Sequence, residues 1–451
     1  MRAGVAVPHA CSTLPFARPR SVDGSEYART TFARPSHDLL PTLGESWTGG
    51  TTAMADRVTV IGWDGSPLSQ AAQAAIDAAT LVAGGSQQLQ ALDLSKGVER
   101  MVLGSVELVA RRVADHRGAA VVVADGDPGF FGVVRTLRRP EYGLELEVVP
   151  AVSSVAAAFA RAGMPWDDAQ IVSTHGRGLR RAVNICRANA KVAVLTAPGA
   201  GPSELALMLR DVHRTFVICE ALGTPDENVT VLTSDRVPDH LWRDPNVVLV
   251  VGGSGRNGAT PPSGWLAGRP VGYPDSARGW ALPSETNGYE RDLPAPVRAL
   301  VLARLGPRPG DLLWDIGAGD GAVAVEAARC GAAVIAVDRD ADACARLDVN
   351  ARRAGVEVQT VPGTAPEVLA DLPEPDTVLV RGGAAVLRAC LARRPERIVA
   401  VPGSLGQAEE IRHAFAESGY RVEGSLLQSS PLDADGQLGA ASPGFVLWGD
   451  R

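Results

Sequence analysis

The stretch Leu312–Arg329, which reads LLWDIGAGDGAVAVEAAR, decides the fold of the carboxy-terminal third of the chain. An apolar run that ends at Asp315 predicts a buried strand, and the alanine-rich run from Ala322 predicts a helix. The glycines between them suit a tight turn, because glycine reaches backbone conformations closed to other residues. A helix that begins directly after such a turn points free N–H groups at a ligand. The stretch therefore predicts a strand, a loop and a helix that hold a cofactor.

A second acidic residue supports a nucleoside cofactor. Asp338 ends the next apolar run, AVIAVD. A carboxylate at that strand end can accept hydrogen bonds from both hydroxyls of an adenosine ribose. NAD uses the same layout, and the spacing Gly317-x-Gly319-x-x-Ala322 nearly satisfies the dinucleotide pattern. The glycine loop alone therefore leaves S-adenosylmethionine and NAD open.

Three further features favour S-adenosylmethionine. Asp315 stands two residues before the first glycine, where it can face the methionine amino group. A third strand ends at Gly363–Glu367, which can border the adenine, and a fourth ends at Arg381-Gly382-Gly383. The residues predicted to bind the cofactor here are Asp315, Gly317, Ala318, Gly319, Asp320, Gly321, Asp338 and Ala365.

These motifs resemble a known family. VRALVLARLGPRPGDLLWDIGAGDG, GTAPEVLADLPEPD and VRGG are similar to the carboxy-terminal domain of the precorrin-6Y methyltransferases of cobalamin biosynthesis. That resemblance implies a seven-stranded, Rossmann-like class I methyltransferase domain whose last strand is antiparallel. Two positions depart from the family pattern. Leu293-Pro294 stands where the family has Thr-Lys, and Arg381 stands where it has an apolar residue.

The amino-terminal part carries a different set of motifs. DGDPGFFG (125–132), VPAVSSV (149–155) and STHGR (173–177) resemble the tetrapyrrole methylase family, which binds S-adenosylmethionine between two α/β lobes. The turn after the first strand departs from it, since Gly-Trp-Asp-Gly-Ser replaces the usual Gly-x-Gly-Pro-Gly. The cofactor-binding residues that this resemblance implies are Gly62, Asp125, Gly126, Asp127, Ser153 and Ser154.

The candidate residues for the chemistry are Asp127, His175 and Arg177 in the amino-terminal unit and Arg381 in the carboxy-terminal unit. Arginines suit a substrate with many carboxylates, because the guanidinium pairs a carboxylate in a bidentate fork. Arg180 and Arg181 are further candidates, although solvated surface charge explains them better. Taken singly, the other residues have structural explanations too. An aspartate such as Asp127 caps turns, and a serine such as Ser153 caps helices.

Two methyltransferase units on one chain imply two methylations. By resemblance, the enzyme methylates precorrin-6B at carbons 5 and 15, removes carbon dioxide from the ring-C acetate and yields precorrin-8. The amino-terminal unit then acts at carbon 5, and the carboxy-terminal unit acts at carbon 15 and decarboxylates. The alternatives left open are a fused methyltransferase for another small molecule or for RNA, an NAD-dependent oxidoreductase, and a non-catalytic carrier of corrin intermediates.

Composition narrows these possibilities. The net charge of −7 over 451 residues argues against a nucleic-acid binder. The six cysteines show no metal-ligand spacing, so no metal site and a reducing cytoplasm are expected. The chain lacks an apolar run long enough to cross a membrane. We expect a cytoplasmic homo-oligomer, and the family resemblance implies that its substrate is an acidic tetrapyrrole.

Hydrophobic periodicity predicts the organisation of the chain. Residues 1–55 show no period and predict a disordered tail. Short β-rich runs alternate with helical runs over 56–252, in lobes of about 56–150 and 151–252, which predicts α/β layers. One of these helical runs is Gln70–Ala83. A Gly/Pro/Ser-rich linker over 253–287 and a second α/β domain over 288–451 follow.

Overall fold

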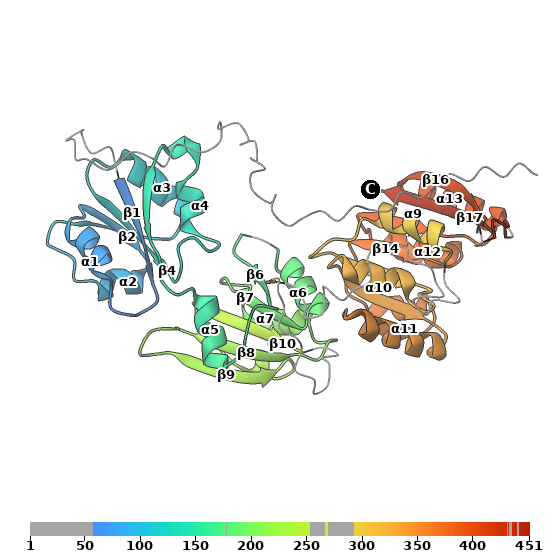
Figure 1. The fold of residues 1–451 in the computed structure, drawn as a ribbon, viewed down its shortest axis with the longest axis horizontal. Helices are drawn as coiled ribbons and strands as arrows, with labels where there is room; N and C mark the ends of the chain where they lie inside the picture. Colours follow the sequence, from blue (N-terminus) through green and yellow to red (C-terminus); the bar gives the residue numbers. More distant parts are fainter. Residues whose placement is uncertain are drawn as a thin grey trace, which may run out of the picture. The chain divides into compact units, whose positions relative to one another are not determined.

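The computed structural model describes residues 57–176, 178–252, 267–268, 293–430, 432, 435–439 and 442–451. The expected tail over 1–55 and nearly all of the expected linker over 253–287 lie outside the described residues. We refer to 57–252 as the amino-terminal half and to 293–451 as the carboxy-terminal half. The described chain is mixed α/β and contains three sheets (Figure 1).

The first lobe of the amino-terminal half is a parallel five-stranded sheet of order β3-β2-β4-β1-β5. Its inner strands β1, β2 and β4 are mostly apolar and buried, as strands covered on both faces are, whereas the edge strands β3 and β5 carry exposed charged residues. They are β1 (Arg57–Trp63), β2 (Leu81–Gly84), β3 (Glu99–Val102), β4 (Ala120–Asp125) and β5 (Glu145–Val149). The helices are α1 (Gln70–Asp77), α2 (Ser86–Ala91), α3 (Val106–Asp115), α4 (Val133–Leu137) and the 3-10 turn Pro140–Tyr142.

The predicted helix Gln70–Ala83 is wrong in its last part. Helix α1 ends at Asp77, and Leu81–Gly84 forms strand β2. Leu81, Val82 and Ala83 have no exposed surface, since β2 lies between β3 and β4 inside the sheet. Alanine-rich sequence favours a helix locally, but burial on both faces of the sheet decides the outcome.

The second lobe is a five-stranded sheet of order β6-β7-β10-β8-β9, in which only the β6–β7 pair is parallel. Its strands are β6 (Gln170–Ser173), β7 (Lys191–Leu195), β8 (Thr215–Glu220), β9 (Asn228–Thr233) and β10 (Asn246–Val251). The helices are α5 (Ser154–Ala162), α6 (Leu179–Ala188), α7 (Pro202–Met208) and the 3-10 turn Val237–Asp239.

The carboxy-terminal half is a seven-stranded sheet of order β13-β12-β11-β14-β15-β17-β16, with β17 antiparallel to both neighbours. This confirms the seven-stranded, Rossmann-like prediction. The strands are β11 (Leu312–Ile316), β12 (Ala333–Asp338), β13 (Gln359–Pro362), β14 (Thr377–Val380), β15 (Arg397–Ala400), β16 (Arg421–Ser429) and β17 (Ser442–Asp450). The helices are α9 (Ala295–Leu305), α10 (Ala322–Arg329), α11 (Ala341–Ala354), the 3-10 helix Glu367–Asp371, α12 (Ala384–Ala392) and α13 (Leu405–Glu417).

Helices cover both faces of this third sheet. Apolar side chains of α9, α10 and α11 pack with one face, and those of α12 and α13 pack with the other. Between the helices of the first face lies a buried ion pair, in which Arg298 Nε donates to Glu326 Oε1 at 2.9 Å. Arg298 Nη1 also donates to the carbonyl of Leu293 at 2.9 Å. The position where Leu293 departs from the family pattern thus ties the start of α9 to the core.

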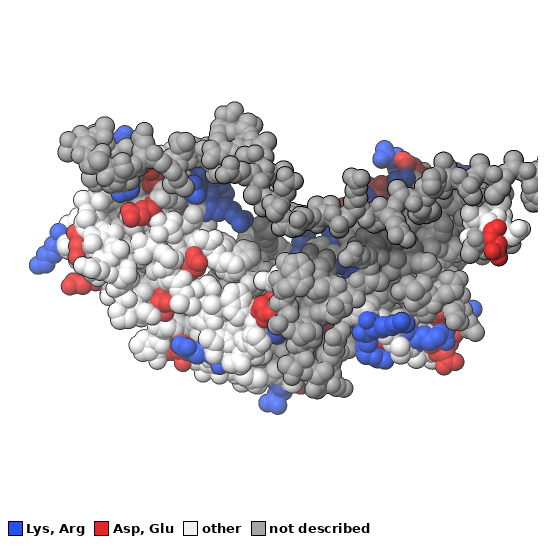
Figure 2. Space-filling model, in the orientation of Figure 1, with Lys and Arg blue, Asp and Glu red and all other residues white. Residues whose placement is uncertain are grey.

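Charged side chains of both signs are interspersed over the described part of the face in Figure 2. In the described part of the chain, no helix combines the length and apolarity that a membrane span requires.

Candidate active sites

The glycine loop of the carboxy-terminal half connects β11 to α10 at the carboxyl end of the sheet. Gly317, Gly319 and Gly321 all have positive φ angles, of 80°, 56° and 85°. A Cβ atom on Gly321 would lie 2.4 Å from Leu347 Cγ, which no packing tolerates. The loop therefore requires glycine where α10 begins, and it keeps the backbone open toward the sheet edge.

Asp338 anchors this loop from the end of β12. Its Oδ2 accepts a hydrogen bond from the Gly319 N–H at 2.8 Å, and its Oδ1 accepts one from the Asp340 N–H at 2.9 Å. The Asp338 carboxylate thus lies beside the glycine loop, at the strand end that the sequence predicted for it.

Arg381 reaches over the loop from the end of β14. Its Nη2 donates to Asp315 Oδ1 at 3.1 Å, to Asp315 Oδ2 at 3.2 Å and to the carbonyl of Ala318 at 2.7 Å. Asp315 has no exposed side-chain surface, and that of Arg381 is 12% exposed. The sequence proposed these residues for different ligands, whereas the folded chain pairs them with each other.

Helix α11 supplies two contacts to the loop that sequence reasoning missed. Arg346 Nε donates to Asp320 Oδ1 at 2.8 Å, and Asn350 Nδ2 donates to the carbonyl of Asp320 at 2.9 Å. These residues are four apart on the helix and so share a face. That spacing was the available signal. Ala365, the remaining predicted residue, follows β13 and packs partly buried against the core.

In the amino-terminal half, three loops meet at the carboxyl end of the first sheet. A Cβ atom on Gly62 would lie 2.4 Å from the carbonyl oxygen of Gly126 and 2.8 Å from the amide of Ala151. A Cβ atom on Gly126 would lie 2.9 Å from the amide nitrogen of Ser154. The folded chain therefore brings together the three motifs that hold Gly62, Gly126 and Ser154.

Asp125 ends β4 at this edge and has a fixed partner. Gln88 Nε2 donates to Asp125 Oδ1 at 2.6 Å, while Gln88 Oε1 accepts from the Gly85 N–H at 2.8 Å. Hydrogen bonds at both the oxygen and the nitrogen of the Gln88 side-chain amide therefore fix its orientation. Asp125 is open to solvent, but surrounding protein removes enough water to raise the pKa of its carboxyl. No sequence spacing links Gln88 to Asp125, so sequence reasoning missed this contact.

Asp64 joins the first loop to the third. Its Oδ1 accepts from the Ser66 N–H at 3.0 Å, and its Oδ2 accepts from the Val152 N–H at 3.3 Å. Desolvation alone would raise the pKa of Asp64, but these hydrogen bonds lower it below its ordinary value. The sequence signal was the departure of this turn from the usual glycine-proline pattern.

Two predicted residues make local capping contacts as well. Asp127 Oδ1 accepts from the Gly129 N–H at 2.8 Å, and Ser153 Oγ accepts from the Ala156 N–H at 3.1 Å as the N-cap of α5. These contacts fix the shape of the loops. His175 donates its backbone N–H to Ser173 Oγ at 3.2 Å, just after β6. Arg177 lies outside the described residues.

Comparisons with known proteins match both halves. A family profile described as tetrapyrrole (corrin/porphyrin) methylases matches residues 60–238. A second, described as a precorrin methyltransferase domain, matches residues 294–438.

Three curated relatives illustrate the match. A precorrin-6Y C(5,15)-methyltransferase (decarboxylating) of Sinorhizobium sp. is 35% identical over 335 residues, which are 72% of this chain and 77% of that protein. A cobalt-precorrin-7 C(5)-methyltransferase of Salmonella typhimurium is 34% identical over 36% of this chain and 82% of its own length. A probable cobalt-precorrin-6B C(15)-methyltransferase (decarboxylating) of Pyrobaculum calidifontis is 36% identical over 28% of this chain and 77% of its own length.

The order of the two matching profiles agrees with the order of the two sets of loops described above. Together with a relative of which most of the length is matched, this settles the classification. The chain belongs to the precorrin-6Y C(5,15)-methyltransferase (decarboxylating) family.

Proposed function

We propose that this protein methylates precorrin-6B at carbons 5 and 15 with S-adenosylmethionine and removes carbon dioxide from the ring-C acetate, giving precorrin-8. The amino-terminal half acts at carbon 5, and the carboxy-terminal half acts at carbon 15 and decarboxylates. The relatives with separate C(5) and C(15) activities, each similar to only part of this chain, support the division.

The single observation that carries the proposal is the position of two carboxylates beside the glycine loop. Asp315 lies at the end of β11, and Asp338 lies at the end of β12 and contacts Gly319. The Asp338 carboxylate at the end of β12 suits the ribose hydroxyls of a nucleoside, and the Asp315 carboxylate, buried and bound to Arg381, holds the glycine loop beside it. This arrangement of carboxylates beside the glycine loop therefore fits S-adenosylmethionine.

When bound, S-adenosylmethionine supplies a sulfonium methyl group that is already a strong electrophile. The reduced macrocycle offers carbon nucleophiles, so the protein needs no base before transfer. The loops must hold the two reacting atoms in line at about 3–3.5 Å and exclude water. Decarboxylation needs the acetate held out of the macrocycle plane and poorly solvated, while the protonated macrocycle accepts the electrons.

In the amino-terminal half, we propose that Gly62, Gly126 and Ser154 shape the cofactor loops and that Asp125, Asp127 and Ser153 line them. His175 and Arg177 are proposed to face the substrate, because the STHGR motif that holds them resembles that of the tetrapyrrole methylase family. At Gly62 and Gly126 a Cβ atom would clash with neighbouring backbone atoms. Glycine at these positions therefore lets the loops of the proposed cofactor site pack together.

The direct test is incubation of the full chain with precorrin-6B and S-adenosylmethionine labelled in the methyl group. Two labelled methyl groups in the product and one released carbon dioxide per macrocycle are expected. Transfer to a different acceptor, or no transfer while the protein binds the macrocycle, would contradict the proposal. Protection against heat by S-adenosylhomocysteine but not by NAD would separate it from the oxidoreductase alternative.

Arg381→Leu restores the apolar residue that the family has at this position. We expect S-adenosylmethionine to bind the carboxy-terminal site roughly tenfold more weakly, because Asp315 and the carbonyl of Ala318 lose their charged donor. Methylation at carbon 15 should fall with it, while methylation at carbon 5 stays unchanged. Titration calorimetry and product mass measure the two effects.

The matched control is Arg353→Leu, which removes an exposed arginine from α11. It should leave both methylations intact. Tighter cofactor binding in Arg381→Leu would instead mean that the arginine competes with the cofactor for Asp315.

A further inference from the structure

Helix α6 of the second lobe contacts the carboxy-terminal half at its first turn. Arg180 Nη1 lies 2.8 Å from Asp376 Oδ1, and Arg180 Nη2 donates to the carbonyl of Glu374 at 2.7 Å. Asp376 directly precedes β14 and also accepts the Leu312 N–H at 2.7 Å. Arg180 therefore binds a carboxylate that is itself fixed to the third sheet, although 43% of its side-chain surface stays exposed.

The middle of α6 continues the contact. Asn184 is 2% exposed, and its Nδ2 donates to the carbonyl of Gly310 at 3.0 Å and to Asp376 Oδ2 at 3.5 Å. Ala188, at the end of the helix, packs against the apolar core of the carboxy-terminal half. Gly310 and Asp376, which accept hydrogen bonds from the buried Asn184 amide, both belong to the other half. A buried amide matched in this way is typical of a specific interface.

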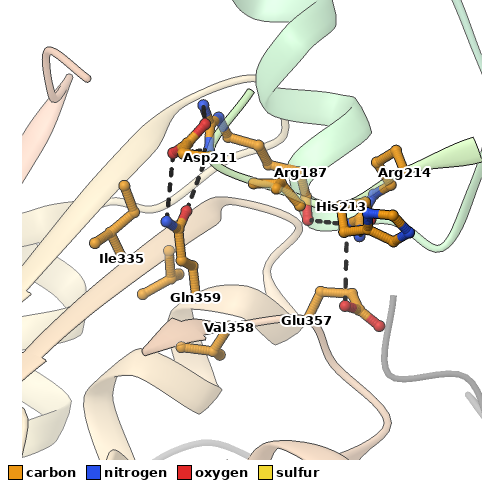
Figure 3. A pocket seen from close by; sticks show the side chains of 10 residues that line it. Arg187, Asp211, His213, Arg214, Ile335, Glu357, Val358 and Gln359 are labelled. Carbon is orange, nitrogen blue, oxygen red and sulfur yellow. Dashed lines mark hydrogen bonds and ion pairs between the residues drawn. The ribbon is translucent and has the colours of Figure 1, made fainter. Parts of the chain in front are cut away.

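The end of α6 carries a charged cluster, shown in Figure 3. Arg187 pairs with Asp211 at 2.6 Å, and Gln359 of β13 accepts from Arg187 Nη1 at 3.1 Å and donates to Asp211 Oδ2 at 3.3 Å. Arg214 lies 4.0 Å from Glu357 of the carboxy-terminal half. Positive charge from the second lobe thus meets polar and negative groups of the third sheet.

The edge that α6 contacts is the amino-terminal edge of the third sheet. Gly310 and Asp376 precede β11 and β14, and Gln359 begins β13. The glycine loop and Arg381 follow the carboxyl ends of their strands, and Asp338 is the last residue of β12. In parallel sheets ligands bind at the carboxyl ends, so contact at the opposite edge leaves the cofactor site open.

We propose that the Arg180–Asn184–Arg187 face of α6 is a docking surface for the carboxy-terminal half, and that the two halves stay associated through it when the chain between them is cut. Its partner is the amino-terminal strand edge formed by Gly310, Asp376, Glu357 and Gln359. The association is separate from substrate identity, so it does not rest on the proposed function.

The test uses the full chain with a specific protease site inserted after Gly258. After cleavage, the two fragments are expected to sediment as a one-to-one complex at micromolar concentration. Asn184→Asp replaces a donor with a carboxylate of equal size beside Asp376, and should weaken association at least roughly tenfold. Arg180→Glu should weaken it further, because it reverses the charge that faces Asp376.

Glu357→Lys provides a second disruption from the other half and leaves α6 unchanged. Arg210→Glu is the matched control, since it reverses an exposed arginine of the same lobe and should not alter sedimentation. Circular dichroism of each fragment verifies folding. Native fragments that separate at micromolar concentration would overturn the proposal. So would variants of Asn184, Arg180 and Glu357 whose fragments associate as tightly as the native ones.

Discussion

Asp338→Ala is expected to abolish S-adenosylmethionine binding by the carboxy-terminal half, so that the full chain binds one equivalent of cofactor in place of two. The Asp338 carboxylate accepts hydrogen bonds from the Gly319 N–H at 2.8 Å and from the Asp340 N–H at 2.9 Å. In the proposed complex it also accepts the ribose hydroxyls. Each hydrogen bond to a charged group contributes about 1.5–3 kcal/mol, so losing two of them weakens binding at least about a hundredfold.

Titration calorimetry on the full chain measures both the stoichiometry and the affinity. Asp342→Ala is the control, because Asp342 is an exposed acid in the first turn of α11, close in sequence to Asp338. Gly319→Val should reproduce the loss, since a β-branched residue strongly disfavours the φ of 56° at that position. Two equivalents bound with native affinity in both Asp338→Ala and Gly319→Val would remove the cofactor assignment from this loop.

Gly65→Ala and Gly223→Ala are expected to cause the largest losses of stability. The two glycines lie in the loops after β1 and β8 and cross in direct backbone contact. A Cβ atom on Gly65 would lie 1.8 Å from the carbonyl oxygen of Gly223, and one on Gly223 would lie 1.9 Å from that of Asp64. Both residues also have positive φ, of 86° and 76°. The loops would have to separate, which would move Asp64 away from Val152.

The positive φ alone costs an alanine about 1–2 kcal/mol. With the added displacement of backbone, we expect a loss above roughly 4 kcal/mol in the free energy of unfolding, together with loss of methylation at carbon 5. Gly163→Ala separates the two contributions. Gly163 has a φ of 64°, but no described heavy atom lies within 4 Å of the Cβ that it would gain. Chemical denaturation that gave Gly65→Ala and Gly163→Ala the same stability would contradict the steric argument.

Local sequence was sufficient for the elements that hold the candidate cofactor sites. The apolar runs that end at Asp315 and Asp338 became β11 and β12, because a strand buried on both faces tolerates few polar residues. The prediction failed where local preference and burial disagree. Alanine-rich Gln70–Ala83 reads as one helix, yet Leu81–Gly84 is an inner strand of the first sheet. Propensity is a weak signal beside the burial of a whole strand.

The sequence by itself therefore determined the strands that precede the candidate cofactor loops, the glycine loops and the order of two methyltransferase units. Each of these depends on residues that are neighbours along the chain. Only the tertiary structure decided that Arg381 pairs with Asp315, that Gln88 orients Asp125, and that Asn184 of α6 binds the amino-terminal edge of the third sheet. Those contacts join residues 66, 37 and 126 positions apart. Strand order and helix packing set such distances, and no local periodicity encodes them.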